Sequence, residues 1–156
     1  MKRRWPSCAR GWPPIGLGAE LFRTYWLALL AEAHGTVGQA EEGLGLLREA
    51  LVVVEKSREH QWEAELYRLQ GELLLTRAAA HHLEAEACFQ QALTIARRQQ
   101  AKAWELRAAM SLSRLWQQQG KRTEAHQLLA PVYGWFTEGF DTADLQEART
   151  LLETLG

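Results

Sequence analysis

The sequence has few residues that break helices or favour strands. Four of its 156 residues are proline, and three of these precede Ile15. Valine and isoleucine, which favour strands, are sparse. Alanine, leucine, glutamate, glutamine and arginine dominate instead, and all five are good helix formers. We therefore expect an all-α protein.

Cysteine is almost absent as well. The two cysteines, Cys8 and Cys88, lie far apart, and neither belongs to a CxxC pair. A disulfide framework and a structural zinc site both need more cysteines at closer spacing. Cys88 falls between Ala85 and Ala92 on a helical stripe, so we expect a small buried hydrophobic residue there rather than a ligand.

The charges indicate no polyanionic partner. The net charge is −1, whereas domains that bind nucleic acids or anionic membranes carry a basic surface. Residues 1–17 are basic and rich in Pro, Gly and Trp without periodicity, which is typical of a disordered tail or linker. They lack the apolar core of a signal peptide, and no run reaches the roughly 18 apolar residues of a membrane span. We expect a cytoplasmic protein that contacts neither a membrane nor a nucleic acid.

Three segments of the chain superimpose on one another, although the second needs two extra residues in its central turn. They begin at Phe22, Trp62 and Trp104. Each has a small residue midway along its first half: Ala31, Gly71 and Ser113. A second small residue comes early in its second half: Gly43, Ala85 and Ala125. Large apolar residues follow four positions later: Leu47, Phe89 and Leu129. Three positions further on lie Ala50, Ala92 and Val132.

Matched columns of small and large residues indicate pairs of antiparallel helices. Small residues on facing helices let the two backbones approach, and the large residue one turn later fills the space beside that contact. Gly38 and Gly120 occupy the same position between the two helices, where a residue that adopts a positive φ ends the first helix. Trp62 and Trp104 recur at matched positions, which favours packing over stacking on nucleic-acid bases.

The columns also predict where the repeats lie. One domain is expected at 18–156, with repeats at about 19–60, 61–100 and 101–136. A final helix at 142–155 is expected to close the array, N-capped by Asp141 or Thr142. Asp144 would lie in its first turn, where a negative charge is favourable.

The order of small, small, large and small residues with a turn glycine resembles the tetratricopeptide repeat. The spacing departs from the usual 34 residues, because Gly43, Ala85 and Ala125 lie 42 and 40 residues apart. The segment VYGWFTEGFDTADLQEA at 132–148 resembles most specifically the C-terminal helical region of large bacterial signalling proteins. Those proteins join an adenylate or guanylate cyclase domain, or a LuxR-type DNA-binding domain, to an ATPase domain of the STAND kind. The resemblance implies a right-handed α-solenoid with a regulatory or protein-binding role.

No motif for catalysis, cofactor binding or metal binding is found. The pair at 120–121 lacks the P-loop glycine that should stand five residues earlier. The glycines at 43–45 fall inside an expected helix, where no dinucleotide loop forms. Adjacent His81 and His82 point in different directions and lie in a turn, so we expect solvated side chains there rather than metal ligands. No serine has an evident base and orienting partner. We expect no enzymatic activity, no cofactor and no metal.

The predicted repeats do, however, indicate a binding surface. In stacked helix pairs the first helices line a concave face, which usually holds an extended peptide or a helix of a partner. The repeat register predicts that this face carries eight candidate contact residues: Tyr25, Glu32, Glu65, Arg68, Glu72, Arg107, Met110 and Arg114. We expect a non-catalytic module that binds a protein or peptide segment, or a neighbouring domain in cis.

Two alternatives stay open. The chain resembles a piece of a larger bacterial signalling protein, whose cyclase or ATPase activity would reside in a domain that is absent here. The chain could instead be a scaffold that self-associates through its first helix, since Phe22, Trp26 and Leu30 lack an N-terminal neighbour to cover them.

Overall fold

The computed structural model describes residues 18–156 of the chain. The tail predicted at 1–17 lies outside the described residues. These described residues form seven α-helices and one short 3-10 helix, η1, and contain no strand. The all-α prediction is therefore confirmed. The helices are α1 (Gly18–Thr36), α2 (Ala40–Ser57), α3 (Glu63–Arg77), η1 (Ala79–His81), α4 (His82–Arg98), α5 (Lys102–Gln118), α6 (Arg122–Gly134) and α7 (Ala143–Leu155).

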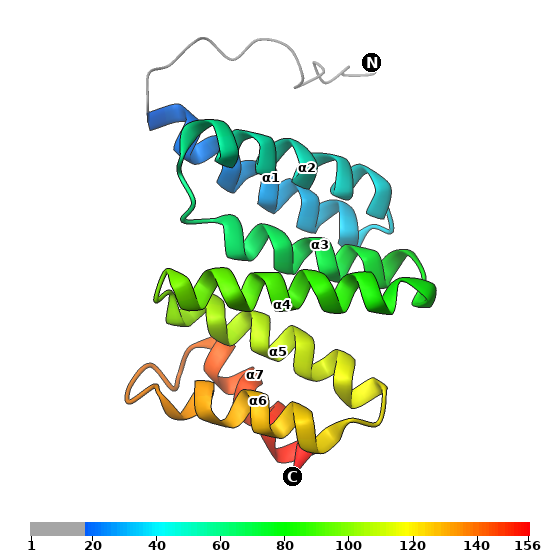
Figure 1. Cartoon of the computed structure of the whole chain (residues 1–156), viewed down its shortest axis with the longest axis vertical. Coiled ribbons are helices and arrows are strands. Elements are labelled where there is room, and N and C mark those ends of the chain that lie inside the picture. Colours follow the sequence, from blue (N-terminus) through cyan, green and yellow to red (C-terminus); the bar gives the residue numbers. More distant parts are fainter. Residues whose placement is uncertain (1–17) are drawn as a thin grey trace, which may run out of the picture.

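The helices form a linear stack (Figure 1). Each α-helix packs against the next one along the chain, and α1, α3, α5 and α7 also contact one another in succession. Among the described residues, no helices further apart than this are in contact. Helix α7 contacts α6 and α5 just as α5 contacts α4 and α3. It therefore extends the stack by one more first helix.

The two columns of small residues lie where the paired helices come closest. A Cβ atom on Gly43 would stand 2.9 Å from the carbonyl oxygen of Ala31 on the facing helix. In the third pair the hydroxyl of Ser113 donates to the carbonyl oxygen of Ala125 at 3.1 Å. Glycine, alanine and serine at these positions let the backbones approach, as the sequence pattern predicted.

The second helix pair uses the same columns in another way. A Cβ atom on Gly71 would stand 2.5 Å from the Cε1 atom of Phe89, whose ring is fully buried. The absent side chain of Gly71 thus makes room for the largest residue of the column, because core side chains fill the space that neighbours leave.

The turns between paired helices follow the predicted scheme in two of three cases. Gly38 and Gly120 both have positive φ angles, 78° and 79°. Such angles are strained for any residue with a Cβ atom, so glycine ends the first helix at both sites. The longer second turn contains η1 and leads directly into α4.

The start of α7 differs from the prediction in one respect. Thr142 occupies the N-cap position, but its side chain makes no capping hydrogen bond. Its hydroxyl donates instead to the carbonyl oxygen of Gly139 at 2.7 Å. Packing rather than capping holds this helix, whose buried residues are Leu145, Ala148, Leu151 and Leu155.

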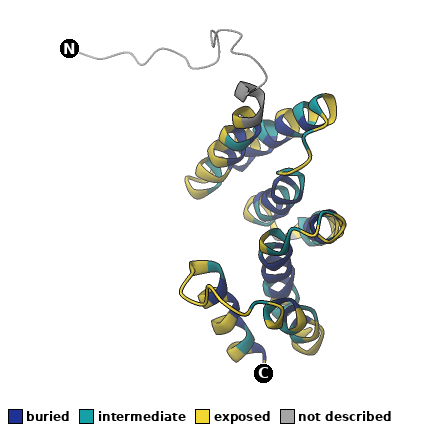
Figure 2. Ribbon diagram, turned by 90° about the vertical axis from the view of Figure 1, so that its left-hand side faces the viewer, coloured by how far each residue is buried: buried dark blue, intermediate teal, exposed yellow. Residues whose placement is uncertain are grey.

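One core runs along the whole stack. Its buried residues come from every α-helix between α1 and α7, and Figure 2 shows them along the interior of the helix layers. None of the described helices combines the length and the apolar character that crossing a lipid bilayer requires.

Candidate functional site

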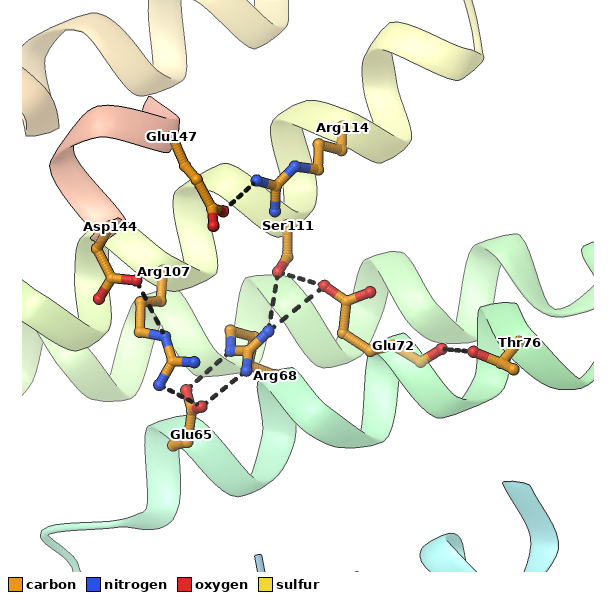
Figure 3. A network of polar contacts seen from close by, with 9 residues as sticks. All are labelled: Glu65, Arg68, Glu72, Thr76, Arg107, Ser111, Arg114, Asp144 and Glu147. Carbon is orange, nitrogen blue, oxygen red and sulfur yellow. Dashed lines mark hydrogen bonds and ion pairs between the residues drawn. The ribbon is translucent and has the colours of Figure 1, made fainter. Parts of the chain in front are cut away.

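The structure divides the eight predicted contact residues by exposure. Glu32 is exposed, and four more are partly exposed: Tyr25, Glu72, Arg107 and Arg114. The other three are buried: Glu65, Arg68 and Met110. Most of the charged members belong to one polar network between α3, α5 and α7 (Figure 3).

Arg68 lies at the centre of this network. Its Nε atom donates to Oε2 of Glu65 at 2.8 Å, and its Nη2 atom donates to Oε1 of the same carboxylate at 2.7 Å. Residues 65 and 68 are three positions apart on α3, which places them on one side of the helix. Two parallel hydrogen bonds of this kind are the strongest geometry for an arginine–carboxylate pair.

Ser111 joins α5 to this pair. Its hydroxyl donates to Oε1 of Glu72 at 2.6 Å, and it accepts a 3.4 Å hydrogen bond from Nη1 of Arg68. Arg68 is 8% exposed and Glu65 is 6% exposed, so both charges are largely removed from water. Buried charges are tolerated only when they are paired and hydrogen-bonded, and both conditions hold here.

Burial by itself would lower the pKa of the Arg68 guanidinium. The hydrogen bonds and the charge of Glu65, followed by the charges of Glu72 and Glu32, outweigh burial and raise the pKa above its ordinary value. Arg68 is therefore a fixed positive charge held by neighbouring carboxylates. Its role in the described structure is to join α3 to α5.

Helix α7 completes the network from the other side. Nη1 of Arg107 lies 2.7 Å from Oε1 of Glu65, and its Nε atom lies 3.8 Å from Asp144 on α7. Arg114 pairs with Glu147 on α7 at 2.9 Å. Ser111 and Glu147 are absent from the eight residues predicted from the sequence, and Asp144 was expected only as a favourable charge near a helix start. The spacing of three between Asp144 and Glu147, on one face of the last helix, was the available signal.

A shallow depression lies beside this network, between α5 and α7. It is open to solvent and has a volume of about 430 Å³. Polar and small side chains make up most of its lining: Arg114, Ala143, Gln146, Glu147, Thr150, Leu151 and Thr154. Of the eight predicted residues, Arg114 is the one that lines it.

Aromatic rings connect the first three odd-numbered helices near their N-terminal ends. The ring centroids of Tyr25 and Trp62 are 5.0 Å apart, and those of Trp62 and Trp104 are 5.4 Å apart. The sequence alignment placed Phe22 in this column, but Phe22 is 64% exposed and Tyr25 takes its place in the row. Positions 22 and 25 lie about 60° apart around α1, and only the ring of Tyr25 reaches Trp62.

A second ion cluster joins the end of α4 to the start of α5. Glu105 accepts hydrogen bonds from Lys102 at 2.8 Å and from Arg97 at 2.9 Å. Burial would raise the pKa of this carboxyl group, but the hydrogen bonds and charges of Lys102 and Arg97 lower it below its ordinary value.

The remaining polar candidates do not converge. His81 lies 3.1 Å from Glu84, and no group of three metal-binding side chains occurs within the described residues. Cys88 is half-buried against the core, and burial, followed by the charge of Glu84, raises the pKa of its thiol.

The sequence matches no known family model, and no curated protein is significantly similar to it.

Proposed function

We propose that this chain is a non-catalytic protein-interaction module built from tetratricopeptide-like helix pairs. The proposed binding surface is the side of α5 and α7 that carries the depression beside Arg114. Its ligand would be an extended or helical protein segment, from a separate partner or from a neighbouring domain in cis.

The observation that carries this proposal is the linear stack itself. Because each helix contacts only its near neighbours, successive first helices present one extended surface, and extended surfaces of this kind are used to hold peptides. Along it, Glu72, Arg114 and Glu147 keep substantial exposure, with side chains that are 39%, 43% and 58% exposed. Both signs of charge are therefore available to select a segment with complementary charges.

The buried part of the network supports that surface rather than offering contacts. Arg68 and Glu65 hold α3 against α5, and Arg107 connects both to α7. Rigid support of this kind fixes the exposed charges in position, which lowers the entropy lost when a ligand binds. The module would serve as a regulatory or scaffolding region, as in the bacterial signalling proteins that the sequence resembles.

The test is a binding measurement with a matched pair of charge reversals. Peptides selected by display against the full chain would be measured by fluorescence anisotropy. Arg114→Glu changes a residue that lines the depression, whereas Arg149→Glu changes an arginine of α7 that does not line it. We expect Arg114→Glu to weaken binding about tenfold or more, and Arg149→Glu to leave it near the wild-type value.

One result would contradict the proposed binding surface. Equal losses in the two variants would mean that general charge, and not the depression, attracts the peptides. Circular dichroism of both variants would establish that they stay folded. Arg68→Glu is unsuitable as a probe, because it would place two carboxylates together inside the structure.

A further inference from the structure

Helix α1 carries an apolar face that nothing in the described structure covers. Its exposed members include the aromatic residues Phe22 and Trp26, which are 64% and 58% exposed. The other members of this exposed stripe are Leu29, Leu30, Ala33 and Val37, the last directly after the helix. At 3.6 residues per turn these six positions fall within about 100° of arc. None of them is charged.

The opposite side of α1 is also apolar and faces the core. Leu27, Ala28 and Ala31 are buried there. A surface helix normally has one apolar side and one polar side, whereas a helix that is apolar on both sides is usually covered on both. The composition of α1 is therefore that of a helix inside a stack, not of a helix at the edge of one.

The matching positions of α3 and α5 support this interpretation. In the repeat alignment Trp26 corresponds to Leu66 of α3 and Ala108 of α5, which are 0% and 1% exposed. Helices α2 and α4 pack against α3 and α5, respectively, from the preceding pair. Helix α1 keeps a large apolar residue at the same position, although no described helix precedes it.

We propose that this stripe is the interface between two copies of the chain, which pair through antiparallel α1 helices. The order of residues along the stripe is self-complementary. If the two-fold axis passes between residues 29 and 30, the bulky Trp26 of one copy faces the small Ala33 of the other. The same register places Phe22 opposite Val37 and Leu29 opposite Leu30. A two-fold interface must match a surface to itself, and this stripe does so residue by residue.

The size of the stripe fits a homodimer of modest affinity. Together its side chains expose roughly 500 Å² of mostly apolar surface on each copy, which is at the upper end of what monomers leave uncovered. Two copies would bury about 1,000 Å², which is near the lower limit for a specific interface. The dimer would use a different part of the molecule from the depression between α5 and α7, so neither proposal depends on the other.

The first experiment is sedimentation equilibrium of the full chain over a wide concentration range. We expect the apparent mass to rise from 17.7 kDa toward twice that value. Leu30→Glu should weaken self-association at least tenfold, because it places two carboxylates beside the two-fold axis. Leu83→Glu is the matched control, since Leu83 is a leucine of α4 that is 81% exposed. The Leu83→Glu variant should self-associate like the wild type.

The second experiment tests the register by charge. Trp26→Lys and Ala33→Glu should each weaken self-association, whereas an equimolar mixture of the two variants should form a heterodimer. In that heterodimer the ammonium group introduced at position 26 of one copy faces the carboxylate introduced at position 33 of the other. The symmetry-related contact, between Ala33 of the first copy and Trp26 of the second, is unchanged from the wild type. A parallel pairing would place position 26 opposite position 26, so the two introduced charges would not meet and the heterodimer would not regain the affinity of the wild type.

Three results would overturn the proposal. The first is a Leu30→Glu variant that associates as strongly as the wild type, and the second is a mixture of charged variants that shows no rescue. The third is a wild-type chain that stays monomeric at every concentration. If Trp26→Glu lowers the melting temperature of that monomer, another segment of the same chain covers the stripe.

Discussion

The close contact between Gly71 and Phe89 gives the most direct test of the packing. Replacing Gly71 with alanine has two opposing effects on the free energy of unfolding. Alanine stabilises a helix interior by about 1 kcal/mol relative to glycine. The added methyl group, however, would lie 2.5 to 2.9 Å from three carbon atoms of a ring that has no exposed surface. Overpacking of this kind costs about 1–3 kcal/mol.

Because the added methyl group meets three ring atoms at once, we expect the clash to outweigh the gain in helix propensity, with a net loss of up to about 2 kcal/mol in Gly71→Ala. For a domain of this size such a loss lowers the melting temperature by up to about 8 °C. Gly45→Ala is the matched control, because Gly45 lies inside α2 and an added Cβ atom there meets no atom within 4 Å. Its melting temperature should rise.

Urea unfolding followed by circular dichroism would measure both variants. The double variant Gly71→Ala/Phe89→Leu should be more stable than the sum of the single changes predicts, since leucine relieves the clash. If Gly71→Ala stabilises the protein as much as Gly45→Ala does, then Gly71 and Phe89 are not in contact and this packing is wrong.

Two further changes test other parts of the stack. Ala85→Leu should lower the free energy of unfolding by about 1–3 kcal/mol, because Ala85 is fully buried in α4; wild-type stability in urea would argue against that position in the core. Glu105→Gln should destabilise the protein at pH 7 by about 1 kcal/mol, a modest figure because Arg97 and Lys102 are partly exposed. The folded pKa of Glu105 is lowered, so its contribution is present above the ordinary glutamate pKa of about 4.3 and is lost as the pH falls through the lowered value. The stability difference between Glu105→Gln and wild type should therefore shrink as the pH falls below that ordinary value, and thermal melts that keep it constant would contradict this assignment.

The sequence predicted the packing columns well because they are local and repeated. Ala31, Gly71 and Ser113 recur at one register, and small residues at such positions have few roles other than close helix packing. The helix ends at Gly38 and Gly120 were equally predictable from the sequence, since a glycine between two amphipathic segments commonly ends a helix.

The burial and the pairing of the polar residues could not be predicted in the same way. Glu65 and Arg68 have the spacing of an exposed ion pair on one helix. Their burial depends on α5, which supplies Ser111, and on Arg107, which bridges to α7. Those contacts join segments about 40 residues apart, and no helical periodicity reports them.

The exposed stripe of α1 is an intermediate case. Its apolar pattern and the lack of a predicted neighbour could be recognised from the sequence around Phe22, Trp26 and Leu30. The exposure of Ala33 and Val37 on the same side of α1 as these three residues was established only by the structure, which separates the exposed side of α1 from the core side.

The proposed protein-binding surface is the side of α5 and α7 around Arg114. A nuclear magnetic resonance titration of the isotope-labelled full chain with a selected peptide would locate the residues that the peptide contacts. We predict that the backbone amide shifts change around Arg114 on α5 and around Gln146, Glu147 and Thr150 on α7. Changes confined to α2, α4 and α6, or no saturable change at all, would show that the side around Arg114 does not bind the peptide.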